Sequence, residues 1–152
     1  MYRFSPIKNK EELLTAIEYL HISCNKLCKQ ALGNYLPPSG NVGVFCHYEN
    51  EFQFLTKLRE ELTDKNNNWN QKYYKLHQSI IIDQKDDIPE AIYTHLYIRR
   101  PDESKPQVGD IDFVLDEGKF EELKKLTKKS AEINNVEISY RPDLDMLQLS
   151  TP

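Results

Sequence analysis

The chain has 152 residues, of which 39% are hydrophobic and 29% are charged, a composition typical of a folded globular protein and not of a disordered one. The net charge of −4, from 20 basic and 24 acidic residues, disfavours a protein that mainly coats nucleic acid, because such binding depends on clustered lysine and arginine. No apolar run is long enough to span a bilayer, and the N-terminus lacks the apolar core of a signal peptide. We therefore expect a cytoplasmic protein with no membrane contact.

The N-terminal region predicts one long helix, over residues 11–32. Apolar residues recur there in steps of three and four and form a single stripe: Leu13, Ile17, Leu20, Cys24, Leu27 and Ala31. Gly33 is the expected C-cap, and Pro37 and Pro38 prevent the helix from continuing. Residues 33–40 are therefore predicted to be a connector.

Residues 41–100 predict a first strand-helix-strand-strand unit. Alternating side chains predict a strand over residues 42–47. A helix follows over residues 49–62, with four apolar residues on one face: Phe52, Leu55, Leu58 and Leu62. Two further strands are predicted over residues 73–82 and 92–100.

Residues 109–152 predict a second unit of the same kind. A strand is predicted over residues 110–115 and a helix over residues 118–129. The positions of this helix that we expect to face inward are Phe120, Leu123 and either Leu126 or Thr127. Two strands over residues 136–140 and 145–149 complete the unit.

The resulting order is an N-terminal helix followed by two strand-helix-strand-strand units. This order predicts an α+β fold, in which the strands form a mixed or antiparallel sheet with helices on one face. The length favours a single domain over residues 1–152. That domain would consist of the helix and connector (1–40), the first unit (41–100) and the second unit (109–152).

The strand over residues 92–100 carries the most informative pattern in the chain. Alternation directs a set of mostly apolar residues toward a core: Ile92, Thr94, Leu96 and Ile98. The other face carries two phenols, an imidazole and a guanidinium, from Tyr93, His95, Tyr97 and Arg99. Phenols supply stacking surface and hydroxyl groups, and a guanidinium clamps carboxylates or phosphates. We predict these four residues as a ligand-binding site, the simpler alternative being a polar face that only meets water.

Two aspartates on the next predicted strand suggest a metal site as a second hypothesis. Asp110 and Asp112 share one strand face, and His95 joins them if the strands pair in a suitable register. Imidazole and carboxylate ligands together suit zinc, manganese and ferrous iron, so a divalent metal is the cofactor in this hypothesis. The simpler alternative is that Asp110 caps or bends the start of the strand after Gly109.

The three cysteines, Cys24, Cys28 and Cys46, are expected to be reduced thiols, because their number is odd and no secretion signal is seen. A zinc site could be drawn from His21, Cys24 and Cys28, which have helical spacing. However, Cys24 lies on the apolar stripe of the first helix, Cys28 lies beside it, and Cys46 alternates with two valines. Core packing is therefore the favoured interpretation.

The later half carries the run GDIDFVL over residues 109–115, a helix, and then RPDLDMLQL over residues 141–149. With the repeated strand-helix-strand-strand order, these segments resemble the vicinal oxygen chelate superfamily, which includes glyoxalases and antibiotic-resistance proteins. The resemblance implies a metal-dependent activity, with metal-binding His and Glu on paired strands. In this chain the opening position carries Asp110 or Asp112, and the closing strand offers Gln148 and no Glu.

The function that we predict first is binding of a small molecule or peptide on the polar and aromatic sheet face. One alternative is a divalent-metal-dependent enzyme of vicinal oxygen chelate-like architecture. Another is a module that binds protein or nucleic acid, since aromatic residues on a sheet can stack on bases. The net acidity makes nucleic acid the less favoured partner, and a second copy of the chain completing a sheet edge would give a homo-oligomer.

Overall fold

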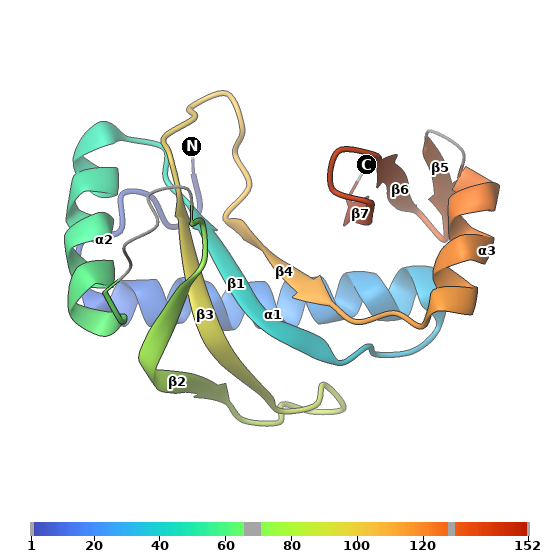
Figure 1. The fold of residues 1–152 in the computed structure, drawn as a ribbon, viewed down its shortest axis with the longest axis horizontal. Helices are drawn as coiled ribbons and strands as arrows, with labels where there is room; N and C mark the ends of the chain where they lie inside the picture. Colours follow the sequence, from blue (N-terminus) through green and yellow to red (C-terminus); the bar gives the residue numbers. More distant parts are fainter. Residues whose placement is uncertain (1, 66–70, 128–129, 152) are drawn as a thin grey trace. The chain divides into compact units, whose positions relative to one another are not determined.

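The computed structural model describes residues 2–65, 71–127 and 130–151, and it confirms the predicted α+β class (Figure 1). The sequence predicts the type of every described element except β5, and most ends agree within a few residues. The elements in chain order are α1 (Lys10–Leu32), β1 (Pro38–Phe45), α2 (Glu49–Leu62), β2 (Tyr74–Ile82), β3 (Ala91–Arg99), β4 (Gly109–Phe113), α3 (Glu117–Thr127), β5 (Ser130–Ile133), β6 (Val136–Arg141) and β7 (Met146–Ser150).

The described strands form two sheets, not one. A mixed sheet has the strand order β2-β3-β1-β4, in which β1 runs parallel to β3 and β2 runs antiparallel to β3. An antiparallel sheet has the order β5-β6-β7. β4, which the sequence analysis groups with the later strands, therefore pairs with the earlier ones, beside β1.

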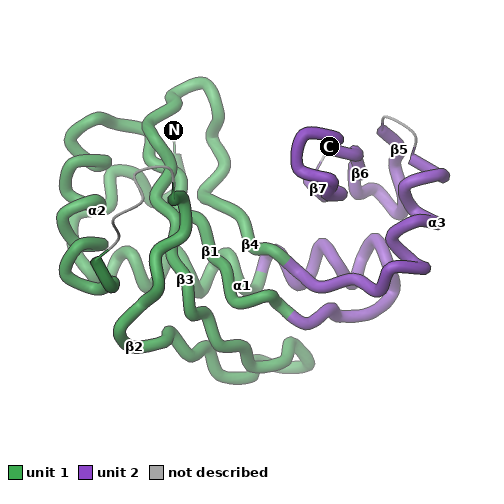
Figure 2. The backbone as a smooth tube through the Cα atoms, viewed as in Figure 1, with its two compact units in different colours: residues 1–22, 38–112 green, residues 23–37, 113–152 purple. Residues whose placement is uncertain are grey.

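The chain divides into two compact units (Figure 2). The first unit takes residues 1–22 and 38–112, and it holds the start of α1, α2 and the mixed sheet up to Asp112. The second unit takes residues 23–37 and 113–152, and it holds α3 and the antiparallel sheet. The division falls within α1, so this helix contributes side chains to both cores.

The core of the first unit is aliphatic. Its buried residues from α1, β1, α2 and β3 include Leu13, Ala16, Ile17, Leu20, Val42, Val44, Leu55, Leu96 and Ile98. Burial of side chains of this kind contributes about 1.5–3 kcal/mol each, so the core is the main source of stability. Figure 1 shows α1 passing behind β1 and β3, and Leu13, Ile17 and Leu20 of its apolar stripe are buried.

The cysteines pack as hydrophobic residues. Cys46 follows β1 and is buried beside the valines of that strand, and Cys28 is buried in α1. Burial raises the pKa of Cys28 to about 11 and that of Cys46 to about 12, so both thiols stay protonated and unreactive near neutral pH. Cys24, predicted on the buried stripe, is only half-buried.

The core of the second unit forms where α1 meets the antiparallel sheet. Ala31 packs there with Val136 and Ile138 of β6, and partly buried neighbours surround them: Leu27, Leu32, Ile133, Leu147 and Leu149. In α3, Thr127 is buried and Leu126 is 63% exposed, which decides between the two predicted inward positions. The last predicted helical residues, 128 and 129, lie outside the described residues.

β5 is the strand that sequence analysis misses. It pairs with β6 through a two-residue turn at Asn134 and Asn135, whose φ angles are 51° and 65°. Asparagine tolerates positive φ, and two such residues make the tight turn that matches strand twist. None of the helices in the described ranges is long and apolar enough to cross a membrane.

Gly109 permits the close approach of β4 to β1, and we expect the Gly109→Ala variant to be destabilised by about 1–3 kcal/mol. A Cβ at this position would collide with the carbonyl oxygen of Gly43 and lie 2.7 Å from Leu20 Cδ1. Urea denaturation measures the change. The control is Gly118→Ala in α3, where the nearest atom, Asp116 Oδ1, is 3.4 Å away and a small gain in stability is expected. Equal stability of both variants would contradict a tight contact at Gly109.

Candidate functional site

The first half of β3 does not follow the predicted alternation. The later apolar residues of the strand are buried as predicted, but Tyr93 is fully buried and Ile92 is 56% exposed, so the prediction is wrong for these two residues. In this part of the sheet the pairing of β2 with β3 is also irregular, with a register shift between Lys75 and Ile80.

Tyr93 therefore belongs to the interior and not to the surface where a ligand would bind. Its hydroxyl lies 2.6 Å from Nδ1 of His21, and Nε2 of His21 lies 3.0 Å from the carbonyl oxygen of Pro89. A carbonyl oxygen only accepts hydrogen bonds, so Nε2–H of His21 donates to it. Nδ1 of the neutral ring then accepts a hydrogen bond from the Tyr93 hydroxyl. Desolvation lowers the pKa of His21, which agrees with a neutral ring.

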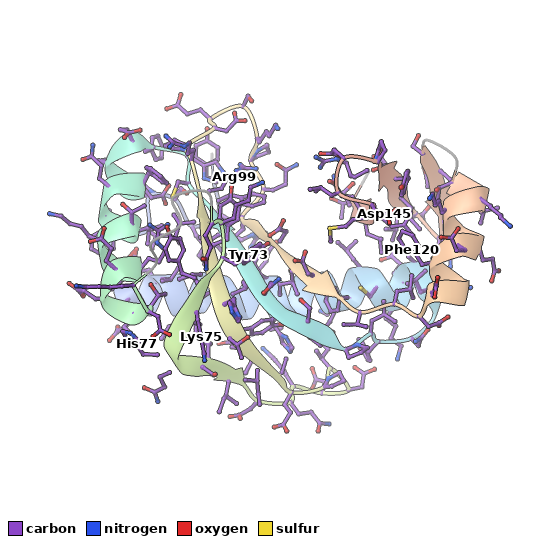
Figure 3. The ribbon with its side chains drawn as sticks, in the orientation of Figure 1. Tyr73, Lys75, His77, Arg99, Phe120 and Asp145 are labelled. Carbon is purple, nitrogen blue, oxygen red and sulfur yellow. The ribbon has the colours of Figure 1, made fainter. Side chains whose placement is uncertain are left out.

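The remaining predicted residues, His95, Tyr97 and Arg99, share a face of β3 with side chains from neighbouring strands. We name this surface, all within the first unit, the polar face. Besides the three residues of β3 it comprises Asn41, Gly43, Phe45, Tyr73, Asp110 and Asp112. Figure 3 labels Tyr73 and Arg99 from this surface.

Gly43 forms the floor of the polar face. The Tyr97 ring and the Asp110 carboxylate both approach the position where a Cβ of Gly43 would stand, with Tyr97 Cδ2 at 3.3 Å from it. Tyr73 lies just before β2, and its ring centroid is 5.5 Å from that of Tyr97 at a tilt of 49°. Asn41 donates from Nδ2 to Oδ2 of Asp112 at 3.3 Å. Side chains from β1, β3 and β4, and from the residue before β2, thus meet over β1.

The Arg99 guanidinium stacks on an aromatic ring. Its guanidinium carbon lies 3.6 Å from the centroid of the Phe45 ring, on the strand paired with β3. Its Nε and Nη2 atoms are buried and have no hydrogen-bond partner among the described residues. Nearly all buried donors in proteins are paired, so two unpaired donors on one side chain are unusual. The described part of the fold supplies no acceptor for them.

Asp110 is a carboxyl group of the polar face whose pKa is raised toward neutral pH. Its pKa is raised to about 6, mainly by desolvation and also by the nearby Asp112 carboxylate, while Arg99 opposes the shift. The residue as a whole is nevertheless exposed, so solvent screening makes the cost to stability smaller than this pKa would give for an enclosed acid. Burial and the two carboxylates also raise the pKa of Tyr73, and burial raises that of Tyr97.

The predicted metal ligands do not come together as a set. β1 lies between β3, which carries His95, and β4, which carries Asp110 and Asp112. Asn41 of β1 bonds Asp112 in the intervening space. Within the described residues, no three His, Cys, Asp or Glu side chains are grouped so that they could hold a metal ion.

The strands implied by the vicinal oxygen chelate resemblance are also separated. Asp110 belongs to β4 in the mixed sheet, whereas Gln148 belongs to β7 in the antiparallel sheet. The two positions therefore do not lie on paired strands.

A half-buried serine with a buried histidine and a buried glutamate forms a second polar cluster that sequence reasoning misses. Glu51 is 2% exposed and accepts from Ser5 Oγ at 3.0 Å, Ile7 N at 2.6 Å and His47 N at 2.8 Å. Ser5 Oγ also lies 2.6 Å from Nδ1 of His47, whose Nε2 lies 2.9 Å from the Lys105 carbonyl oxygen. Serine, and not histidine, sits between the other two, so this is no catalytic triad. The cluster anchors the N-terminal segment to the start of α2.

A shallow hollow of about 240 Å³ borders this cluster and is lined by Pro6, Ile7, Lys8, Asn50, Glu51 and Phe54. Both carboxylate oxygens of Glu51 are already paired, so the hollow presents no unsatisfied polar group of that residue. The polar face is therefore the better candidate for a site, although it is an open surface and not a cavity.

No family model, no curated protein and no solved structure matches this chain. The candidate site is thus interpreted from its own residues and their chemistry.

The buried pair of His21 and Tyr93 predicts the effect of removing one hydroxyl. The Tyr93→Phe variant leaves Nδ1 of His21 without this donor, and we expect a loss of about 1–3 kcal/mol in the free energy of unfolding near neutral pH. Tyr97→Phe on the same strand is the matched control, with an expected change below about 0.5 kcal/mol. Chemical denaturation measures both variants, and equal losses would contradict a structural hydroxyl at Tyr93.

The raised pKa of Asp110 predicts that the folded protein becomes more stable when the charge of this carboxylate is removed. Unfolded Asp titrates near 3.9, so the ionised carboxylate opposes folding progressively as the pH rises from about 4 through about 6. We expect Asp110→Asn to stabilise the protein near pH 7 by no more than about 1 kcal/mol, and by less near pH 4. Asp112→Asn removes the same charge but replaces the carboxylate that accepts from Asn41 with a weaker, neutral acceptor, so it serves as the comparison. A loss of stability in Asp110→Asn near pH 7 would disprove the expectation.

Proposed function

We propose that this protein binds a small molecule on the polar face of its mixed sheet. The observation that carries the proposal is the Arg99 side chain, whose two buried donors have no acceptor among the described residues. A buried donor without a partner costs about 1–3 kcal/mol, and more when the group is charged. A bound ligand that supplies the acceptor removes this cost.

The surroundings of Arg99 support the same proposal. Asp110 has a raised pKa and remains exposed, so it is able to exchange a proton with solvent or with a ligand. The tilted rings of Tyr73 and Tyr97 are half-buried and offer an apolar surface edged by hydroxyl groups. A cation, an acid and two phenols therefore converge on one open surface, a combination typical of binding sites.

The proposal is tested by a fragment screen on the full chain, followed by amide nuclear magnetic resonance. The probes are acetate, benzoate, inorganic phosphate, benzamide and benzylamine, which cover anionic, neutral and cationic chemistry. We expect at least one probe to shift the signals of Tyr97, Arg99 and Asp110 at a saturable concentration. A probe that shifts only residues around the hollow at Glu51, or no probe shifting the polar face, would contradict the proposal.

A further inference from the structure

The two unpaired donors of Arg99 have a defined geometry. Nε and Nη2 lie on the same edge of the guanidinium, so their N–H bonds point the same way and form a two-pronged donor. Such an edge binds the two oxygens of a planar carboxylate, or two oxygens of a phosphate, in parallel hydrogen bonds. The flat face of the same guanidinium is occupied by the Phe45 ring, which fixes the direction in which the edge points.

The charges around Arg99 discriminate between these two ligands. The polar face carries two carboxylates on β4, Asp110 and Asp112, against the single guanidinium of Arg99. Repulsion by these carboxylates grows with the charge of the ligand, so a monoanion is disfavoured less than a doubly charged phosphate. A protonated Asp110 removes one of the two negative charges and adds a donor.

We propose that the ligand of the polar face carries a carboxylate that pairs with the Nε–H and Nη2–H donors of Arg99, while its apolar body lies against Tyr73 and Tyr97. This inference rests on the proposed function and adds the chemical class of the ligand. It assigns Arg99 as the residue that selects the ligand and Asp110 as the residue that makes binding depend on pH.

The pH dependence follows from the groups that face Asp110. They are Asp112 on its own strand, Tyr97 and Arg99 on β3, and Tyr73 before β2, while on β1 the uncharged Gly43 faces it. The phenols stay neutral near pH 7, as tyrosine normally does, and burial raises their pKa values further. Above a pH of about 6 the ionised Asp110 competes for Arg99 and repels the ligand. Affinity for a carboxylate therefore increases as the pH falls.

The test compares benzoate with benzamide, which has the same shape and no charge, by calorimetry on the full chain at about pH 5 and about pH 7. Benzoate is ionised at both values. We expect benzoate to bind at least about tenfold more tightly than benzamide, and several-fold more tightly at the lower pH. The Asp110→Asn variant should keep the affinity of the lower pH at both values.

Two arginine variants locate the contact. Arg99→Lys retains the charge but loses the paired donors and the stacking on Phe45, so we expect benzoate to bind at least about tenfold more weakly. Arg100→Lys, on the next residue along the chain and exposed, is the matched control and should bind benzoate unchanged. If Arg99→Lys does not fold, the benzamide comparison and Asp110→Asn still decide the outcome.

The possible failures are distinct. Equal binding of benzoate and benzamide on the polar face would overturn the carboxylate assignment and leave the proposed binding function standing. Tighter binding of inorganic phosphate than of benzoate would assign a phosphoryl ligand and also overturn it. Benzoate affinity that is the same in Arg99→Lys and Arg100→Lys would remove Arg99 from the interaction. Absence of binding by every probe would overturn the inference and the proposed function together.

Discussion

The absence of a side chain at Gly43 is the constraint on which the polar face depends. Gly43 lies on β1, between β3 and β4, and a Cβ there would meet both the Asp110 carboxylate and the Tyr97 ring. A Cβ at Gly109 would in turn meet the carbonyl oxygen of Gly43. Because both residues are glycine, β4 approaches β1 closely and carries its aspartates toward the side chains of β3. A larger residue at position 43 would separate the acid from the guanidinium.

The two faces of the mixed sheet differ in composition and in their contribution to stability. Aliphatic side chains such as Val42, Val44 and Leu96 are fully buried and supply stability. The polar face holds an arginine with unpaired buried donors and an acid with a raised pKa, neither of which favours folding. Groups of this kind are typical of functional sites, where stability is lost for the sake of chemistry.

Patterns within one element could be predicted from sequence, and relations between elements could not. The stripe of α1 and the glycine after it predict that helix almost to the residue, because both signals are local. The burial of Tyr93 comes with its contact to His21 of α1, a relation between elements that alternation along β3 alone does not contain. The turn at Asn134 and Asn135 was a readable signal for β5, since two adjacent asparagines favour a tight hairpin.

Some residues of the candidate site could be predicted from one strand, and others depend on how the strands pair. The sequence predicts His95, Tyr97 and Arg99 as one surface because they alternate on one strand. Their partners come from other strands: Phe45 joins Arg99 only because β1 pairs in parallel with β3, and Asp110 joins only because β4 lies next to β1. Tyr73 precedes a strand and carries no motif of its own, so its role could be found only from the ring contact with Tyr97.

The hydrogen bond between His21 and Tyr93 joins residues that are 72 positions apart, and the parallel pairing of β1 with β3 spans most of that distance. Contacts of this kind form only after a long loop has closed, so they slow folding. The antiparallel pairing of β2 with β3 is more local and is able to form first. We therefore expect the polar face to assemble late, when β1 inserts between β3 and β4.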